Sequence, residues 1–166
     1  RDKREELRKI GDLLKTDKPA ERLEKVLSDL REREKEIEAL KSKFASQDAV
    51  SIANRARDVN GIKVVSTSVP AMDAKDLRVL ADNIRDRLGS CVLVLASVKE
   101  NQAALVAMVT KDLTGRFNAG TLLKNVAARV GGRGGGKAEM AQGGVSNVTD
   151  PSVLEAALAD VYEQCK

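Results

Sequence analysis

The stretch GGRGGGKAEMAQGG, residues 131–144, sets one arginine and one lysine among seven glycines. Because glycine has no side chain, the peptide N–H groups of such a run can approach a phosphate or a flat base surface closely. Arg133 can hold a phosphate with a forked guanidinium, and Lys137 can add a point charge. The stretch therefore predicts an open, electropositive patch of main chain that binds phosphate or RNA.

Further basic residues lie close to the glycine run. Between residues 111 and 137, six lysines and arginines are opposed by Asp112 alone, so this segment carries a charge of +5 against +4 for the whole chain. Clustered positive charge attracts phosphates and binds them through counterion release. The RNA-binding residues predicted from the run and the cluster are Gly131, Gly132, Arg133, Gly134, Gly135, Gly136, Lys137, Met140, Gln142, Lys111, Arg116, Lys124 and Arg129.

Plainer interpretations of the same residues stay open. The glycine run could be a flexible loop or a series of tight turns without a ligand. Lys111, Arg116, Lys124 and Arg129 could be ordinary solvated charges. Gln142 is expected to hydrogen-bond the backbone of its own loop rather than a base.

The chain contains no histidine, and its aromatic residues are Phe44, Phe117 and Tyr162. The lack of histidine removes the triads, general bases and metal centres that depend on it. The scarcity of rings excludes a base-stacking sheet of the RNA recognition motif type. We expect Cys91 to be a small core residue and Cys165 an exposed terminal thiol. The sequence thus predicts no catalytic residue, no metal site and no cofactor in this chain.

Residues 1–45 are predicted to form a helical arm, as a helical hairpin or a coiled coil. A short amphipathic helix precedes the break TDKP, and a long helix with a heptad-like apolar seam follows it. The seam could pack against a second copy, against the short helix or against other domains of a longer protein, and packing within one molecule is favoured. Its residues are Leu23, Val26, Leu30, Ile37, Leu40 and Phe44.

Residues 46–166 are predicted to form a globular α/β domain. IKVVSTSV, DAKDLRVLADNIRDRLG and CVLVLASV indicate a β-α-β unit, and AALVAMV pairs with the preceding strand as a hairpin. Asn60 and Gly61 are interpreted as a helix end. A helix over residues 121–130 leads into the glycine loop, and a last helix follows Asp150. The expected fold class is α+β, a helical arm followed by a small layered domain with a mixed sheet of three or more strands.

The cellular setting is inferred from what the sequence lacks. No segment reaches the length of an apolar membrane span, and no secretion signal is visible. The chain begins at Arg1 without a methionine. We expect a soluble piece of a longer cytoplasmic protein with no membrane partner.

DVNGIKVVSTSV, LGSCVLVLASV and VTKDLTGRFNAGTLLKNVAARVGGRGGGKAEMAQGG, with the short closing helix, resemble the C-terminal domain of bacterial-type alanyl-tRNA synthetases. The resemblance covers residues 46–166, and the arm matches only in kind. It implies a fold like the DHH-associated domain of phosphoesterases and binding to the outer corner of tRNA, expected to be tRNA-Ala. It also implies that the domain tethers tRNA for the catalytic and editing domains of the same chain. In the family this domain has also been linked to dimerisation, so the resemblance includes a homodimer among the expected partners.

The resemblance further implies that the parent protein is an alanine–tRNA ligase, whose ATP and zinc belong to its other domains, and that this piece is not itself an enzyme. Two alternatives remain. The chain could be the substrate-binding half of a DHH-type phosphoesterase, although GGGKAEM lacks the histidine of that motif and no Asp-His-His motif precedes it. It could also be a structural module, in which the arm dimerises and the α/β domain is a passive cap.

Overall fold

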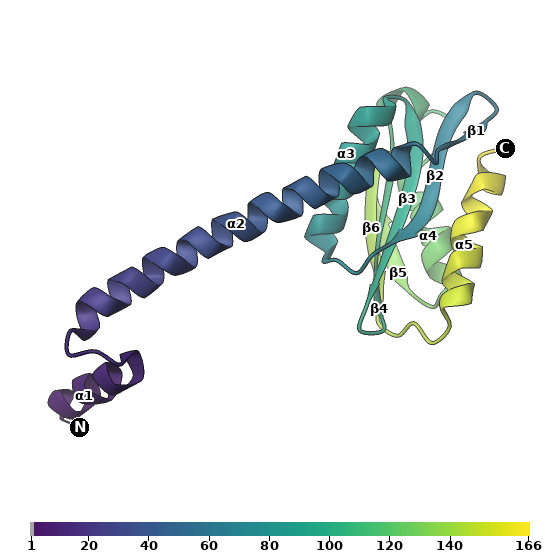
Figure 1. Cartoon of the computed structure of the whole chain (residues 1–166). Helices are drawn as coiled ribbons and strands as arrows, with labels where there is room; N and C mark the ends of the chain where they lie inside the picture. The colour runs from purple at the N-terminus through teal and green to yellow at the C-terminus, as the bar shows by residue number, and fades with distance from the viewer. Residues whose placement is uncertain (1) are drawn as a thin grey trace. The chain divides into compact units, whose positions relative to one another are not determined.

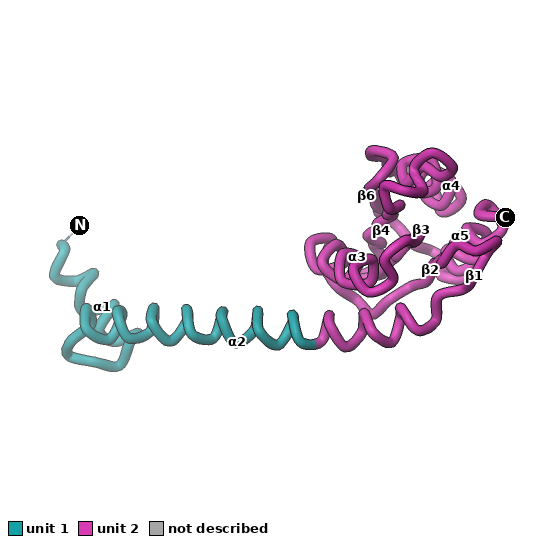
Figure 2. The backbone as a smooth tube through the Cα atoms, turned by 90° about the horizontal axis from the view of Figure 1, so that it is seen from above, with its two compact units in different colours: residues 1–43 teal, residues 44–166 magenta. Residues whose placement is uncertain are grey.

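The computed structural model describes residues 2–166, so Arg1 lies outside the described residues. The chain forms two compact units, residues 1–43 and residues 44–166, coloured separately in Figure 2. The first unit contains α1 (Lys3–Leu14) and most of α2 (Pro19–Ala53). Helix α2 continues without a break across residue 45, and its last turns belong to the second unit.

Short-range hydrogen bonds define the two helices of the arm. Asp2 caps α1 by accepting from the backbone N–H of Arg4 at 3.1 Å, and α1 ends at Lys15 in the left-handed conformation. The Thr16 hydroxyl accepts from the N–H of Lys18 at 3.1 Å, directly before Pro19 begins α2. The predicted break at TDKP is confirmed, because these residues end one helix and start the next.

The apolar seam of the arm is exposed. Its six residues, Leu23 to Phe44, keep between 37% and 62% of their surface accessible. In the described part of residues 1–43 no residue is buried. The short helix α1 therefore does not bury the apolar seam of α2, as packing within the arm would require.

The second unit is built on one sheet, which has six strands within residues 2–166 in the order β1-β2-β3-β4-β6-β5 (Figure 1). Strands β2 and β3 are parallel and the other neighbours are antiparallel, so the predicted mixed sheet and α+β class are confirmed. The strands are β1 (Arg57–Val59), β2 (Ile62–Val69), β3 (Cys91–Lys99), β4 (Gln102–Val109), β5 (Arg133–Gly136) and β6 (Met140–Val145).

Helices cover both faces of the sheet, as Figure 2 shows from above. On one face α3 (Ala74–Leu88) packs on β3 and β4 and buries Leu77, Leu80 and Ile84, as its period predicts. The end of α2 joins this cluster through Ala49 and Ile52. On the other face lie α4 (Ala119–Arg129), after a short 3-10 turn (Lys111–Leu113), and α5 (Pro151–Gln164).

The dipeptide Asn60-Gly61 is a hairpin turn, so its interpretation as a helix end was wrong. Both residues have positive φ angles, 53° and 81°, as a two-residue turn of the primed type requires. They connect β1 to β2, with Val59 opposite Ile62. Helix α2 already ends at Ala53, and the three-residue strand β1 was missed because it is too short to show an alternating pattern.

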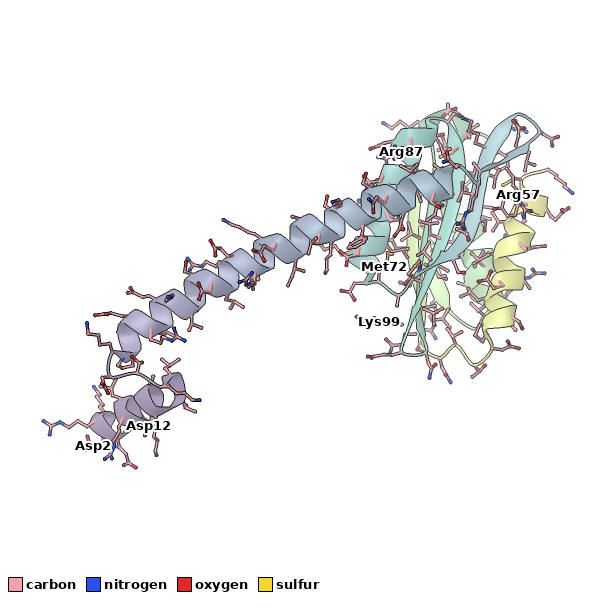
Figure 3. The ribbon with its side chains drawn as sticks, in the orientation of Figure 1. Asp2, Asp12, Arg57, Met72, Arg87 and Lys99 are labelled. Carbon is pink, nitrogen blue, oxygen red and sulfur yellow. The ribbon has the colours of Figure 1, made fainter. Side chains whose placement is uncertain are left out.

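Helix α5 provides hydrogen-bond partners for backbone groups of β2 that the short strand β1 does not reach. The Tyr162 hydroxyl accepts from the N–H of Ser66 at 3.0 Å and donates to its carbonyl at 3.1 Å. The guanidinium of Arg57 lies 4.3 Å from the centre of the Tyr162 ring, and Figure 3 shows Arg57 beside α5. The sheet edge at β2 is thus closed by side chains of α5.

Both cysteines are buried, so the expectation of an exposed Cys165 was wrong. Cys165 packs into the core on the α5 side, and the Lys166 carbonyl accepts from the Asn60 side chain at 2.7 Å, which holds the chain end against the β1–β2 turn. Burial raises the pKa of Cys165, and burial raises the pKa of Cys91 to about 11.

We expect neither cysteine to react with a thiol reagent at pH 8 in the folded protein, because buried, protonated thiols are poor nucleophiles. Both should react once the protein is denatured, and absorbance of the released thiolate measures this. Since the folded pKa of Cys91 is raised, its contribution to stability is complete below the ordinary value near 9 and is lost as the pH rises through about 11. Rapid labelling of the native protein would contradict the burial.

No helix among residues 2–166 is both long enough and apolar enough to cross a membrane.

Candidate nucleic-acid interface

The glycine run is not an open loop, which corrects the sequence-based expectation. Residues 133–136 form β5, which pairs antiparallel with β6, and β6 in turn pairs with β4. Ala138 and Glu139 make the turn between them, and the N–H of Lys137 donates to the Met140 carbonyl at 2.8 Å. Much of the predicted bare main chain is therefore used in the sheet, where β5 is an edge strand.

Close packing against α4 and between the two strands explains two of the glycines. Gly134 and Gly143 are opposite each other on β5 and β6. A Cβ atom on Gly143 would lie 2.5 Å from the Arg133 carbonyl oxygen and 2.7 Å from the Gly134 Cα. A Cβ atom on Gly134 would lie 2.8 Å from the Leu123 side chain of α4. This pair lies in neither a flexible loop nor a tight turn, and glycine is needed here because it lets the helix and the strands approach closely.

Gly131 has a separate role, at the end of α4. Its φ angle is +72°, and the N–H of Gly132 donates back to the Ala127 carbonyl at 2.7 Å. This is the left-handed helix ending that glycine favours.

The other face of the hairpin carries five of the thirteen predicted binding residues. Successive side chains of a strand point to opposite faces, so Arg133, Gly135 and Lys137 lie on the face away from α4. Met140 and Gln142 share this face on β6, and Met140 packs against the cluster that contains α3. Because α3 packs mainly on β3 and β4, most of this face of the hairpin stays uncovered. The structure therefore brings Gly135, Lys137, Met140 and Gln142 together, while Arg133 lies at the other end of β5.

A groove of about 910 Å³ lies over this uncovered face. One wall is the hairpin, residues 135–142, and the floor is the end of β4 with Lys111. The opposite wall belongs to α3, through Arg78, Asp82 and Arg85. The groove combines peptide groups, a methionine-lined floor and basic side chains, which is the chemistry of a site for a phosphate backbone.

Free cations face this groove. Within residues 2–166 the side chains of Arg78, Lys111 and Lys137 form no ion pair. Arg85 is bound to Asp82 at 2.8 Å and to Asp86 at 2.9 Å. The hydrogen bond to Asp86 and the charges of both carboxylates raise the pKa of Arg85.

Asp112, the one acidic residue among the basic residues of segment 111–137, follows Lys111 at the floor of the groove. Its carboxylate accepts hydrogen bonds from the Ser90 and Thr110 hydroxyls, which lower the pKa of Asp112. It therefore stays ionised at neutral pH beside Lys111.

The α3 wall was missed from the sequence. Its three residues follow the spacing i, i+4, i+7 and so share one side of the helix. That spacing was visible, but a charged helix side is usually only solvated, and these residues lie some fifty positions before the glycine run. Only the sheet order brings them opposite the hairpin.

A second hollow, of about 670 Å³, lies at the other end of β5. Arg133 lines it together with Gly131, Gly132 and Gly144. Arg133 and Lys137 are four residues apart on an extended strand, about 13 Å. They therefore stand at opposite ends of the hairpin and face different hollows.

The remaining basic residues lie outside both hollows. Arg129 pairs with Asp160 of α5 at 3.3 Å, which ties α4 to α5. The guanidinium of Arg116 lies 5.4 Å from the ring centre of Phe117, whose ring packs against the core. Lys124 starts from α4, and its Cε lies 3.5 Å from the position of a Cβ atom on Gly135.

A family model described as the DHHA1 domain matches residues 61–166, more than half of the chain. The chain belongs to the DHHA1 family. The matched residues of this DHHA1 domain contain strands β2 to β6 and both walls of the groove.

Similar curated proteins are alanine–tRNA ligases. The ligase of Solibacter usitatus (strain Ellin6076) is 40% identical over 158 residues, which cover 94% of this chain and 18% of that protein. The ligase of Thiobacillus denitrificans (strain ATCC 25259 / T1) is 45% identical over 146 residues, which cover 86% of this chain and 16% of that protein. The chain thus spans less than a fifth of the length of these relatives.

Two solved structures share the fold of this DHHA1 domain. The C-Ala domain of Aquifex aeolicus alanyl-tRNA synthetase is 28% identical, with a TM-score of 0.58, and the match covers 66% of this chain and 96% of that domain. RecJ of Thermus thermophilus is 15% identical, with a TM-score of 0.57, and the match covers 90% of this chain and 21% of RecJ. The predicted resemblance to the alanyl-tRNA synthetase C-terminal domain is confirmed, while the likeness to RecJ shows the fold alone.

Proposed function

We propose that this chain is the tRNA-binding domain of an alanine–tRNA ligase. The observation that carries the proposal is the groove between α3 and the β5–β6 hairpin, where Lys111, Lys137 and Arg78 are unpaired beside side-chain-free backbone. The relatives named above are alanine–tRNA ligases, which makes tRNA the RNA to test.

The outer corner of tRNA, where two loops pack together, is the part that we propose binds here. This corner presents a shaped backbone and an exposed base-pair surface, and recognition of folded RNA by shape needs no aromatic rings. At Gly135 the hairpin presents backbone without a side chain to the groove, beside Met140 and Gln142. Such a contact suits tRNA-Ala in its own ligase but discriminates little between tRNAs.

The role of the domain in the longer protein is then to tether tRNA. Holding the outer corner raises the concentration of the acceptor end at catalytic and editing sites elsewhere in the chain. ATP and zinc would belong to those other domains, in the cytoplasm, and this piece would perform no chemistry itself.

Pairing of two copies through the arm is a subsidiary proposal. Its support is the exposed seam, since an apolar stripe at heptad spacing is the pattern of helices that pack together. The alternative that the chain is the substrate-binding half of a DHH-type phosphoesterase has no comparable support, because the likeness to RecJ extends to the fold only.

A gel shift with two RNAs tests the tRNA-binding proposal. The chain is titrated against intact tRNA-Ala and against a minihelix that keeps the acceptor stem but lacks the corner. We expect at least about tenfold weaker binding of the minihelix, as the loss of several phosphate contacts predicts. Equal affinity for the two RNAs would rule out the outer corner as the contact.

A further inference from the structure

The α3 wall of the groove carries charges that no sequence motif assigns to RNA binding. Arg78, Asp82 and Arg85 line it, opposite Lys137 on the hairpin. Arg78 is exposed and has no ion-pair partner among the described residues. A phosphate backbone bound between the two walls would meet a free guanidinium on the α3 side as well as the hairpin lysine.

Arg85 and Asp82 form a second feature of the same wall. The Asp82 carboxylate is 38% exposed and holds the Arg85 guanidinium at 2.8 Å, and both residues face the groove. Asp86 binds the same guanidinium at 2.9 Å but lies outside the groove. A phosphate that entered the groove would therefore be repelled by Asp82 and would compete with it for Arg85.

We propose that α3 is the second wall of the RNA site, where Arg78 contacts a phosphate directly and Asp82 weakens binding by occupying Arg85. This inference rests on the proposed function and extends it from the hairpin to α3. An exposed ion pair is weak, so a phosphate, which carries charge and several acceptor oxygens, can displace it. Because Asp82 competes with the phosphate for Arg85, the affinity for RNA is lower than it would be without this carboxylate.

The test measures the dissociation constant for intact tRNA by fluorescence anisotropy at several salt concentrations. Asp82→Asn should tighten binding by about two- to fivefold, the value of an exposed charge pair. Arg78→Gln should weaken binding by about fivefold and lower the slope of log K against log salt by about one. Combining Asp82→Asn with Arg85→Gln should cancel the gain, because the guanidinium that faces the groove is then absent.

Asp86→Asn is the matched control. It removes one carboxylate charge that pairs with Arg85, as Asp82→Asn does, but this carboxylate lies outside the groove. The affinity for tRNA should therefore change by less than about twofold. A gain equal to that of Asp82→Asn would overturn the role of the wall, as would an unchanged affinity for Asp82→Asn and Arg78→Gln. If the unsubstituted chain does not bind tRNA, the proposed function fails and this inference fails with it. Melting curves confirm that each variant is folded.

Discussion

Replacing Arg133 and Lys137 together with glutamate is expected to abolish tRNA binding by this chain. Each cation faces a hollow at one end of β5, so the double change reverses the charge along the whole hairpin. Charge-assisted contacts to phosphate are worth about 1.5 to 3 kcal/mol each, which predicts a loss of about a hundredfold or more for the pair. Fluorescence anisotropy with intact tRNA measures the loss.

The control for this experiment replaces another lysine and another arginine, outside the hairpin, with glutamate. Lys63 on β2 and Arg87 at the end of α3 are exposed and line neither hollow. Lys63→Glu combined with Arg87→Glu changes the net charge equally and should leave most of the affinity. If both double variants lose binding to the same extent, the effect is one of net charge and the hairpin has no special role. Equal melting temperatures exclude unfolding as the cause.

A Cβ atom on Gly143 is expected to destabilise the hairpin strongly. In Gly143→Ala the new methyl group would meet the Arg133 carbonyl oxygen at 2.5 Å and the Gly134 Cα at 2.7 Å, and neither backbone atom can move without breaking the β5–β6 pair. Overpacking of this kind costs about 1 to 3 kcal/mol or more. Thermal unfolding followed by circular dichroism should show a melting temperature lower by several degrees.

Gly135→Ala is the matched substitution on the other face of the same hairpin. Its Cβ atom would have only the flexible Lys124 side chain nearby, at 3.5 Å, so the melting temperature should hardly change. Its methyl group would instead stand in the groove, where it should weaken tRNA binding. An equal loss of stability in the two variants would show that close packing does not distinguish the two glycines.

The candidate site was only partly predictable from the sequence. Lys137, Met140, Gln142 and Gly135 were identified from the composition of the run, and they do share one groove. The same reasoning included Arg129, whose charge is paired with Asp160. Composition shows where positive charge is concentrated along the chain, but it cannot show whether a helix turns a side chain towards a carboxylate or towards a groove.

The sequence by itself determined the helices and strands that are marked by a periodic pattern of apolar residues or by a capping residue. The buried strand β3, the amphipathic helix α3 and the capped helix α5 follow from local patterns, because each pattern fixes which face is apolar before any neighbour is present. The resemblance to the family came from the glycine run together with the strand and helix sequences before it and the closing helix.

Only the tertiary structure decided that the glycine run forms β5 and β6 rather than a loop. Glycine has no side chain to alternate between faces, so residues 131–144 carry almost no period from which a strand could be predicted. Their conformation is set by their partners in the fold. Strand β4 supplies the hydrogen-bonding edge, α4 packs too closely on Gly134 for a side chain, and the β5 backbone does the same at Gly143. The position of α3 opposite the hairpin has the same origin, since the order of strands in the sheet brings the two walls of the groove together.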